Sequence, residues 1–249
     1  MFRLIKLKPP HGWNAVAWEL AIVTLGVLLA LAVQQWAVNR EMHDKVQASK
    51  VALRDELSEH YEYAVEFRTV YPCIQAQLRR LRDHVLASGP VMNPIPIYRE
   101  QNFQFVMRFP SKVDPTDAWD AAVSDGLNQR FEPAFRRQLA GHYARIPQIR
   151  ALISANDDAE QGLAALTHRL SLDPPLRYSI IEKIEHLRGR IDILDLYYGQ
   201  QIEYIQKVEM LPATERAQAV TERYGTYKFC KAQGLPMRSF EDAMKPVPN

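Results

Sequence analysis

The sequence predicts an all-α protein in which an N-terminal transmembrane helix continues into an elongated antiparallel helical bundle. Three observations predict it: a charge-free apolar segment near the N-terminus, heptad-spaced apolar residues directly after it, and Asp-Pro pairs that open later helices. The 249 residues hold 31 Lys+Arg against 29 Asp+Glu and are 47% hydrophobic. That balance excludes wholesale disorder and a polybasic nucleic-acid binder.

The first predicted element is the membrane-spanning helix. Residues 20–38, LAIVTLGVLLALAVQQWAV, carry no formal charge. At about 1.5 Å per helical residue they span about 28 Å, close to the roughly 30 Å hydrocarbon core of a bilayer. Trp13 and Trp18 at one end, and Trp36 at the other, have the placement of membrane-interface aromatics.

Two other interpretations of this segment stay open. Ala30-Leu31-Ala32 has the small-x-small form that signal peptidase cleaves, and a buried helix of a soluble protein is apolar too. Against cleavage, helix-favouring residues continue past Ala32 with no breaker before Asn39. Against burial, nothing else in the chain is apolar enough to surround the segment. A signal-anchor helix over residues 15–38 is therefore favoured.

The N-terminal tail, residues 1–14, indicates the orientation. Arg3, Lys6 and Lys8 precede the helix, with no acid before Glu19. The difference in Lys and Arg across the helix is slight, but a short basic tail is easier to retain than a large domain. We expect a single-pass protein of the bacterial inner membrane, with this tail in the cytoplasm and the helical domain in the periplasm.

The second predicted element is a long bundle helix that continues directly from the anchor. No Gly or Pro lies between Val27 and Tyr71, Pro72 is expected to bend the helix, and Ser88-Gly89-Pro90 to end it. A seam in alternating steps of four and three residues runs along it. Its members are Leu53, Leu57, His60, Ala64, Phe67, Tyr71, Ile74, Leu78, Leu81 and Val85.

A short extended or hairpin segment is predicted around residues 91–109, where five Pro residues between 90 and 115 exclude a helix. Phe103, Phe105, Met107 and Phe109 alternate with other residues at the period of a strand, and Val91 to Tyr98 is a possible edge partner. The aromatic residues suit packing onto the helices better than an open binding surface, although both remain possible interpretations.

Further helices follow in the chain. Asp114 is predicted as the N-cap of a short helix that starts at Pro115, carries Trp119 and ends near Gly126. Three longer helices are predicted at Pro133 to His168 with a bend at Pro147, Pro174 to Val208 with Asp173 as its cap, and Pro212 to about Gln233. The predicted bundle domain is thus residues 39–235, and residues 236–249, which hold three Pro, form a flexible tail.

No catalytic or cofactor motif occurs. GxGxxG, GxxxxGK[ST], GxSxG and HExxH are all missing from the sequence, so neither an enzyme nor a cofactor is predicted. The nearest metal-like pattern is a repeated E-x-x-E-H, at residues 56–60 and 182–186. Di-iron bundles need Glu and His three apart, whereas here Glu56 and His60 are four apart. A hydrogen-bonded core His60 and ordinary surface glutamates are the simpler interpretation.

Two groups of residues are candidate sites. The first is a basic patch that can hold an anionic partner, unless it is an ordinary solvated helix face; it consists of Arg130, Arg136, Arg137, Arg145 and Arg150. A smaller basic cluster is Arg79, Arg80 and Arg82. The second group is Cys73 and Cys230, which are expected to pair in an oxidising periplasm and to stay separate buried thiols in the cytoplasm.

The segments GWNAVAWELAIVTLGVLLALAVQQWAVNRE and DPTDAWDAAVSDG resemble those of a broad set of uncharacterised bacterial single-pass membrane proteins, a domain of unknown function. The likeness covers the anchor well and the remainder loosely. Gln35 departs from that set, in which an acid commonly precedes the Trp. The resemblance implies an N-terminal anchor helix followed by a helical domain, and it implies no activity.

These observations favour a membrane-anchored structural or protein-interaction module of the cell envelope, without catalysis. Its expected partners are the lipid bilayer and either another protein or a second copy of the chain. Nucleic acid is not expected, because the pI is only about 8.5 and no groove-reading motif occurs. One alternative is a periplasmic sensory or ligand-binding bundle, whose small molecule the sequence leaves undefined. The second alternative is a metal-binding bundle of carboxylates and histidines.

Overall fold

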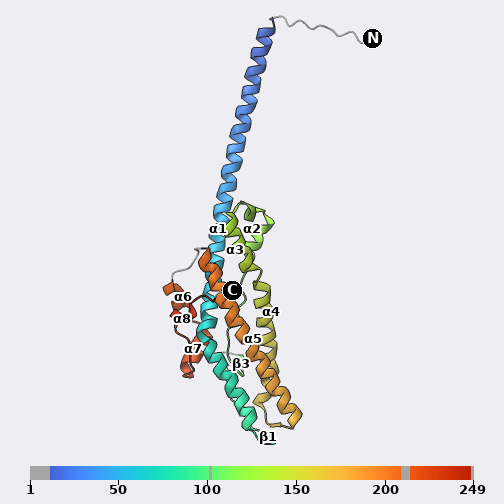
Figure 1. Ribbon diagram of the computed structural model, residues 1–249, viewed down its shortest axis with the longest axis vertical. Helices are drawn as coiled ribbons and strands as arrows, with labels where there is room; N and C mark the ends of the chain where they lie inside the picture. The colour runs from blue at the N-terminus through green and yellow to red at the C-terminus, as the bar shows by residue number, and fades with distance from the viewer. Residues whose placement is uncertain (1–11, 101–102, 209–213, 248–249) are drawn as a thin grey trace, which may run out of the picture. The chain divides into compact units, whose positions relative to one another are not determined.

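The computed structural model describes residues 12–100, 103–208 and 214–247 (Figure 1). By its internal contacts the chain divides into two compact units, Met1–Lys50 and Val51–Asn249. The boundary falls within the first helix, α1, which extends over Gly12–Ala87 and continues through Pro72. The class is all-α, as the sequence predicts: helices dominate both units, and the strands are two or three residues long.

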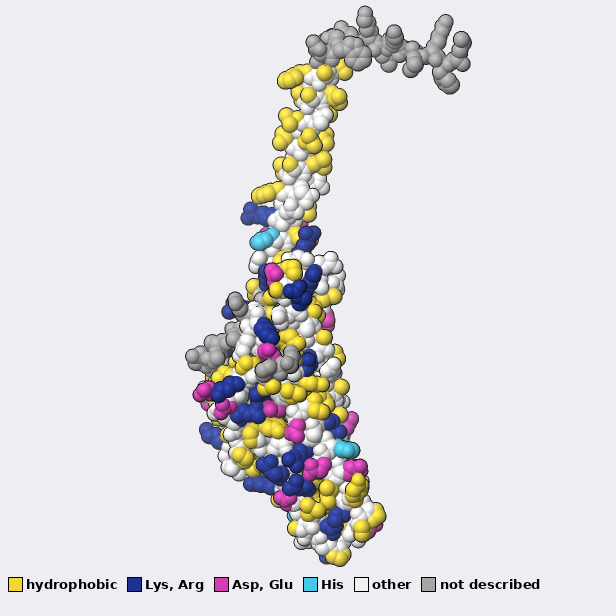
Figure 2. All heavy atoms as spheres, in the orientation of Figure 1, with side chains coloured by type: hydrophobic (Ala, Val, Ile, Leu, Met, Phe, Trp, Pro, Cys, Tyr) yellow, Lys and Arg dark blue, Asp and Glu magenta, His cyan; other side chains and the backbone are white. Residues whose placement is uncertain are grey.

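The first unit contains the apolar part of α1. Its most apolar 18-residue window has a mean hydropathy of 2.3 and none of it is buried, so by length and composition this helix could span a membrane. Figure 2 shows hydrophobic side chains along this part of the helix. Trp36 is 62% exposed, and the guanidinium of Arg40 lies 5.7 Å from the centre of its ring.

The second unit is built around the C-terminal part of α1 together with α4 (Ile146–Gly162) and α5 (Pro174–Lys207). These helices lie side by side, with α5 antiparallel to the other two (Figure 1). The predicted seam of α1 is buried except for Tyr71, which is partly exposed. From α4 and α5 the core receives Ile146, Ile149, Ile153, Ile180, Ile184, Leu187, Ile191, Leu194 and Ile202.

Helix starts follow local rules, but two long predicted helices are each divided. Asp173 caps α5, accepting a hydrogen bond from the Leu176 backbone N–H at 2.7 Å. The helix predicted from 133 to 168 is instead α3 (Pro133–Tyr143), α4 and a 3₁₀ turn, η2 (Ala164–Thr167). Pro147 lies in the first turn of α4, where a missing N–H costs nothing, so it opens a new helix instead of bending an old one.

The C-terminal region is also divided. The helix predicted from 212 to 233 is α6 (Thr214–Thr221) and α7 (Gly225–Ala232), separated by a turn; positions 212 and 213 lie outside the described residues. Gly234, with a φ of +59°, ends α7 in the left-handed conformation that Gly adopts easily. A short helix, α8 (Phe240–Ala243), follows it.

Residues 236–247 differ from the flexible tail that their composition predicts, because they are held against the bundle. Arg238 donates two hydrogen bonds to Asp195 on α5, at 2.9 and 3.0 Å. The Val247 N–H donates to the Gly199 carbonyl at 3.1 Å, and a Cβ on Gly199 would lie 2.5 Å from Val247. Proline content therefore misleads here, since side-chain contacts with α5 supply the order.

The strands form two separate antiparallel pairs. β2 (Tyr98–Glu100) pairs with β3 (Phe103–Phe105), so the predicted strand ends at residue 105 and not at 109. β1 (Val91–Met92) pairs instead with β4 (Leu170–Ser171), eighty residues further along the chain, and not with β3. The hairpin prediction is correct in kind, but only the Tyr98 end of the proposed partner takes part.

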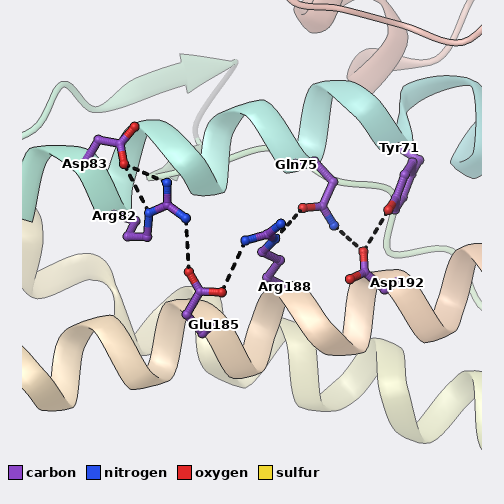
Figure 3. Close-up of polar contacts among 7 residues, drawn as sticks. All are labelled: Tyr71, Gln75, Arg82, Asp83, Glu185, Arg188 and Asp192. Carbon is purple, nitrogen blue, oxygen red and sulfur yellow. Dashed lines mark hydrogen bonds and ion pairs between the residues drawn. The ribbon is translucent and has the colours of Figure 1, made fainter.

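One side of the contact between α1 and α5 is a row of polar contacts, shown in Figure 3. Tyr71 and Gln75 donate to the same Asp192 oxygen, at 2.8 and 2.5 Å. Arg188 then donates to Gln75 at 3.1 Å. Glu185 accepts from both Arg82 and Arg188, at 3.5 and 3.4 Å, which continues the row toward Ala87. This polar row links the two helices at the surface of the core.

Candidate functional site

A disulfide joins α1 to α7. Cys73 and Cys230, the predicted pair, are bonded, with 6.0 Å between their Cα atoms and a separation of 157 positions in sequence. Both residues are fully buried. The bond therefore fixes α7 beside the middle of the bundle, next to the hairpin of β2 and β3.

A cleft of about 450 Å³ lies next to this junction. Its size lies within the range of small-molecule sites. Four segments contribute walls: the loop after β3, α1 with Glu66, α4, and the start of α7. The charged and polar side chains among its lining are Glu66, Gln104, Arg108, Ser111, Lys112, Asp157, Glu160, Gln161, Tyr224 and Thr226.

The base of the cleft is an ion pair between Glu66 and Lys112, with a distance of 2.6 Å from Nζ to Oε2. The side chain of Glu66 is 2% exposed and that of Lys112 30%. Burial raises the pKa of Glu66 and lowers the pKa of Lys112, and each charge opposes the shift of the other. Lys112 also lies over the rings of Tyr63 and Tyr224, which holds its position.

The opposite wall of the cleft comes from α4. Glu160 accepts a hydrogen bond from the Val106 backbone N–H at 2.9 Å and so fastens the loop after β3 to this helix. One turn earlier, Asp157 lines the cleft, and burial is the main cause of the rise in its pKa, followed by the charges of Glu160 and Asp158. The cleft thus offers a carboxylate on one wall and an ion pair at its base, which suits a polar ligand with a cationic group.

A buried polar cluster lies deeper in the bundle, where α1 meets α3. His60 donates from Nε2 to the Pro115 carbonyl at 2.7 Å, because a carbonyl can only accept. Its Nδ1 then accepts from His142 Nε2 at 2.8 Å. Burial lowers the pKa of His60 to about 4 and that of His142 well below its usual range. Both imidazoles are therefore neutral, and one hydrogen bond joins them in the core. This agrees with the core role predicted for His60.

Glu56 of α1 caps a helix that belongs to another part of the chain. Its carboxylate accepts from the Ala118 and Trp119 backbone N–H groups, at 2.8 and 3.3 Å, and from the Tyr143 hydroxyl at 2.5 Å. These N–H groups belong to the first turn of α2 (Asp117–Ser124), whose N-cap residue, Thr116, makes no side-chain capping bond. A short 3₁₀ turn, η1 (Leu127–Arg130), follows α2.

Asp114 is not the helix cap that the Asp-Pro pair predicts. Its side chain is fully buried and accepts a hydrogen bond from Gln201 of α5 at 3.0 Å. Burial raises its pKa to about 7, although Gln201 and Arg150 favour the charged form. Arg150 donates to the Asp114 backbone carbonyl at 2.6 Å. The local pattern is therefore overridden by partners from α4 and α5.

The two E-x-x-E-H segments do not form a common site. In the first, Glu56 and His60 have the partners described above; in the second, Glu182 and His186 are exposed, and Glu185 pairs with arginines. Over the described parts of the chain, no group of three or more His, Cys, Asp or Glu side chains is arranged to hold a metal ion.

The predicted basic patch is divided by the fold. Arg150 points inward to Asp114, and Arg145 donates to Gln200 and lies 5.0 Å from the Tyr197 ring. Arg130 and Arg137 are exposed and Arg136 is partly exposed. The prediction of a single five-arginine surface is therefore wrong, because Arg145 and Arg150 bond to other residues of the bundle. Of the predicted interface tryptophans, Trp18 is 70% exposed and Trp36 is exposed as well, while the side chain of Trp13 lies outside the described residues.

Comparisons with protein-family models, curated proteins and solved structures found no match to the chain.

Sequence reasoning missed the cleft itself. Glu66 and Lys112 are 46 residues apart, and only the fold brings them together. A weak signal existed for Glu66, since it lies between Val65 and Phe67 inside an apolar run of α1. A lone carboxylate in such a run needs a buried partner, but the sequence does not say which cation supplies it.

Proposed function

We propose that the protein is a membrane-anchored helical-bundle protein that acts as a structural or protein-interaction module in the cell envelope, without catalysis. Its apolar helix anchors it as a single-pass protein of the bacterial inner membrane, and its bundle lies in the periplasm. The architecture suits the set of bacterial single-pass proteins whose anchor it resembles. The partners of this module are the bilayer and another protein or a second copy of the chain.

The exposed apolar surface of the first unit carries the anchoring part of this proposal. Between Val16 and Val38, large apolar side chains are exposed on every side of α1, and none of the most apolar window is buried. Leaving this surface in water is unfavourable by roughly 25 cal/mol per Å². A lipid bilayer covers such a helix without requiring any further part of the chain.

The disulfide supports the periplasmic placement of the bundle. Cys73 and Cys230 are buried and bonded, and disulfides persist in the oxidising periplasm but are rare in the reducing cytoplasm. The sequence contains no phosphate-binding loop, and the described residues contain no grouped metal ligands, which is compatible with a binding role.

Thiol labelling in intact cells tests this placement. A membrane-impermeant maleimide is applied with and without a reductant, and the mass shift is read on a denaturing gel. We expect labelling of Cys73 and Cys230 only after reduction and unfolding in spheroplasts with an intact inner membrane. Labelling without reductant, and only after the inner membrane is broken, would place the bundle in the cytoplasm. A Cys73→Ser, Cys230→Ser variant is the unlabelled control.

A second function, ligand binding in a periplasmic sensory bundle, is favoured by the cleft of about 450 Å³. Its wall carboxylate, Asp157, and its basal pair, Glu66 and Lys112, suit a small polar molecule with an amino group. Amines and amino acids are screened for an increase in the melting temperature of the purified chain. A ligand of this cleft is expected to lose its effect in Asp157→Asn and to keep it in Asp158→Asn, the neighbouring control. The absence of any shift would reject this function.

A further inference from the structure

The hairpin of β2 and β3 packs against α7 through three aromatic rings. Tyr98 and Phe229 meet edge to face with ring centres 4.8 Å apart, and Phe105 lies 6.1 Å from Tyr98 and 6.0 Å from Phe229. Cys230, next to Phe229, is the residue that the disulfide ties to α1. The aromatic contact is therefore held in place by a covalent bond.

Tyr98 lines two neighbouring cavities. The first, of about 300 Å³, is lined by Arg99, Lys228, the aromatic rings and small or polar residues of α7. The second, of about 290 Å³, has an apolar lining of Leu81, Ile95, Pro96 and Val106, with Arg80 among its polar residues. Among the described residues no acidic side chain lines either cavity. The two cavities together are called the Tyr98 groove below.

The cations of the Tyr98 groove have no partner within the described chain. Arg80, Arg99 and Lys228 are exposed, and none of them makes a side-chain hydrogen bond or ion pair with another described residue. Nearby Arg82 and Arg188, in contrast, are paired with Glu185. On the face that Figure 2 shows, Lys and Arg side chains gather over the C-terminal part of α1. With a formal charge of only +2 on the whole chain, this local excess of positive charge is a property of the groove.

We propose that the Tyr98 groove binds an acidic peptide segment of a partner protein, in which carboxylates flank an apolar or aromatic side chain. The carboxylates pair with Arg80, Arg99 and Lys228, and the apolar side chain enters the cavity lined by Leu81 and Ile95. This inference rests on the proposed interaction function and names its partner chemistry. Tyr98 of β2 lines both cavities, so one extended peptide segment can contact the two together.

The apolar lining distinguishes a peptide from other polyanions. An anionic glycan or a polyphosphate would gain nothing from burial of Leu81, Ile95, Pro96 and Val106, whereas a Leu or Phe side chain of a peptide would. Rim cations mainly set association rate and charge preference, and the apolar cavity provides the anchor. The test must therefore distinguish binding of an acidic peptide from binding of a phosphate- or carboxylate-rich polymer.

The test uses the full chain in detergent micelles and fluorescein-labelled hexapeptides read by fluorescence anisotropy. The peptides carry Leu, Ile or Phe at one central position between Asp or Glu residues, and matched peptides replace the acids by Asn and Gln. We expect binding by the acidic peptides, weakening by about tenfold in the Arg99→Glu, Lys228→Glu variant, and little change in Arg130→Glu, Lys183→Glu, which has the same charge change elsewhere.

A second variant tests the cavity without changing charge. Ile95→Ala is expected to weaken the acidic peptides and to leave polyphosphate, used as a competitor, unaffected. If no acidic hexapeptide binds, or if polyphosphate or phosphatidylglycerol vesicles bind the groove while the peptides do not, the proposal is overturned. Because this assay uses purified protein, it is independent of the thiol labelling: loss of peptide binding with a periplasmic bundle rejects the groove alone, and a cytoplasmic bundle rejects the location alone.

Discussion

The two ends of α1 belong to one continuous helix but differ in where their apolar side chains lie. Between Val16 and Val38 the large apolar side chains are exposed, whereas between Leu53 and Val85 those of the seam are buried. The second stretch also buries Glu56, His60, Glu62, Glu66 and Arg68, and the first contains no charged residue after Glu19. Apolar content therefore does not predict burial inside the chain.

Burial of apolar side chains therefore depends on whether another part of the chain packs against them. The second stretch is packed inside the bundle, where its buried polar side chains bond to Tyr143, His142, Arg216 and Lys112. No described residue covers the apolar side chains of the first stretch, which carries no charge after Glu19. One stretch is thus covered by protein, and the other is long and apolar enough to be covered by a bilayer.

The largest effect is expected from charge in the first stretch. In the Leu25→Arg, Leu28→Arg variant, each arginine at the centre of a membrane helix costs about 2.5–3.5 kcal/mol of insertion free energy. We expect the protein to leave the carbonate-resistant membrane fraction, while Leu25→Ala, Leu28→Ala stays in it. Retention of the arginine variant would contradict a spanning helix and remove the contrast between the two stretches.

The second largest effect is expected from cavities in the seam. Leu57 and Leu78 are fully buried, so Leu57→Ala or Leu78→Ala should each lower the free energy of unfolding by about 2–5 kcal/mol. Denaturant unfolding followed by circular dichroism measures this. Leu28→Ala, on the first stretch, is the matched control and should change bundle stability little. Equal effects at Leu28 and Leu57 would mean that both stretches are buried in protein.

The buried histidines predict a pH dependence for the second stretch only. The pKa of His60 is about 4 in the folded state against 6.5 ordinarily, so its neutral form is favoured by folding. Its contribution is fully present above pH 6.5 and is lost as the pH falls through 4, a loss of about 3 kcal/mol. The lowered pKa of His142 acts in the same direction.

Asp114 opposes that trend. Its pKa is raised from 3.8 to about 7, so its contribution is present below pH 3.8 and is lost as the pH rises through 7. The Asp114→Asn variant removes this opposing term. We therefore expect its unfolding free energy to fall more steeply than that of the wild type between pH 6.5 and 4.5, measured in denaturant at fixed ionic strength. Equal slopes would show that folding does not raise the pKa of Asp114 above that interval.

The smallest effect is expected in the polar row between α1 and α5. Arg82 is partly exposed and Glu185 more so, and pairs of this kind contribute about 0–1 kcal/mol. Arg82→Ala should therefore lower the unfolding free energy by less than Leu78→Ala, which lies one turn earlier on the same helix. The loss should shrink at high salt, because exposed charges are screened. A loss as large as that of Leu78→Ala would contradict a surface role for this row.

Local rules recovered much of the fold. The apolar run at residues 20–38, the 4-3 seam of α1, and the Asp173-Pro174 start of α5 each depend on residues close in sequence, and each appears as predicted. The two cysteines were expected to pair, and they do so in the structure. These features are determined by the sequence because hydrophobic periodicity and capping act over a few residues.

Only the tertiary structure decided the remaining features. Asp114 has the local pattern of a cap but meets Gln201 in the core, 87 residues away, and His60 meets His142 at a separation of 82. β1 pairs with β4 and not with β3, the predicted partner, and Glu66 forms an ion pair with Lys112. Each of these pairings joins groups whose distance is set by helix packing. No spacing in the sequence encodes that distance, because the partners of a buried polar group are fixed by the whole fold.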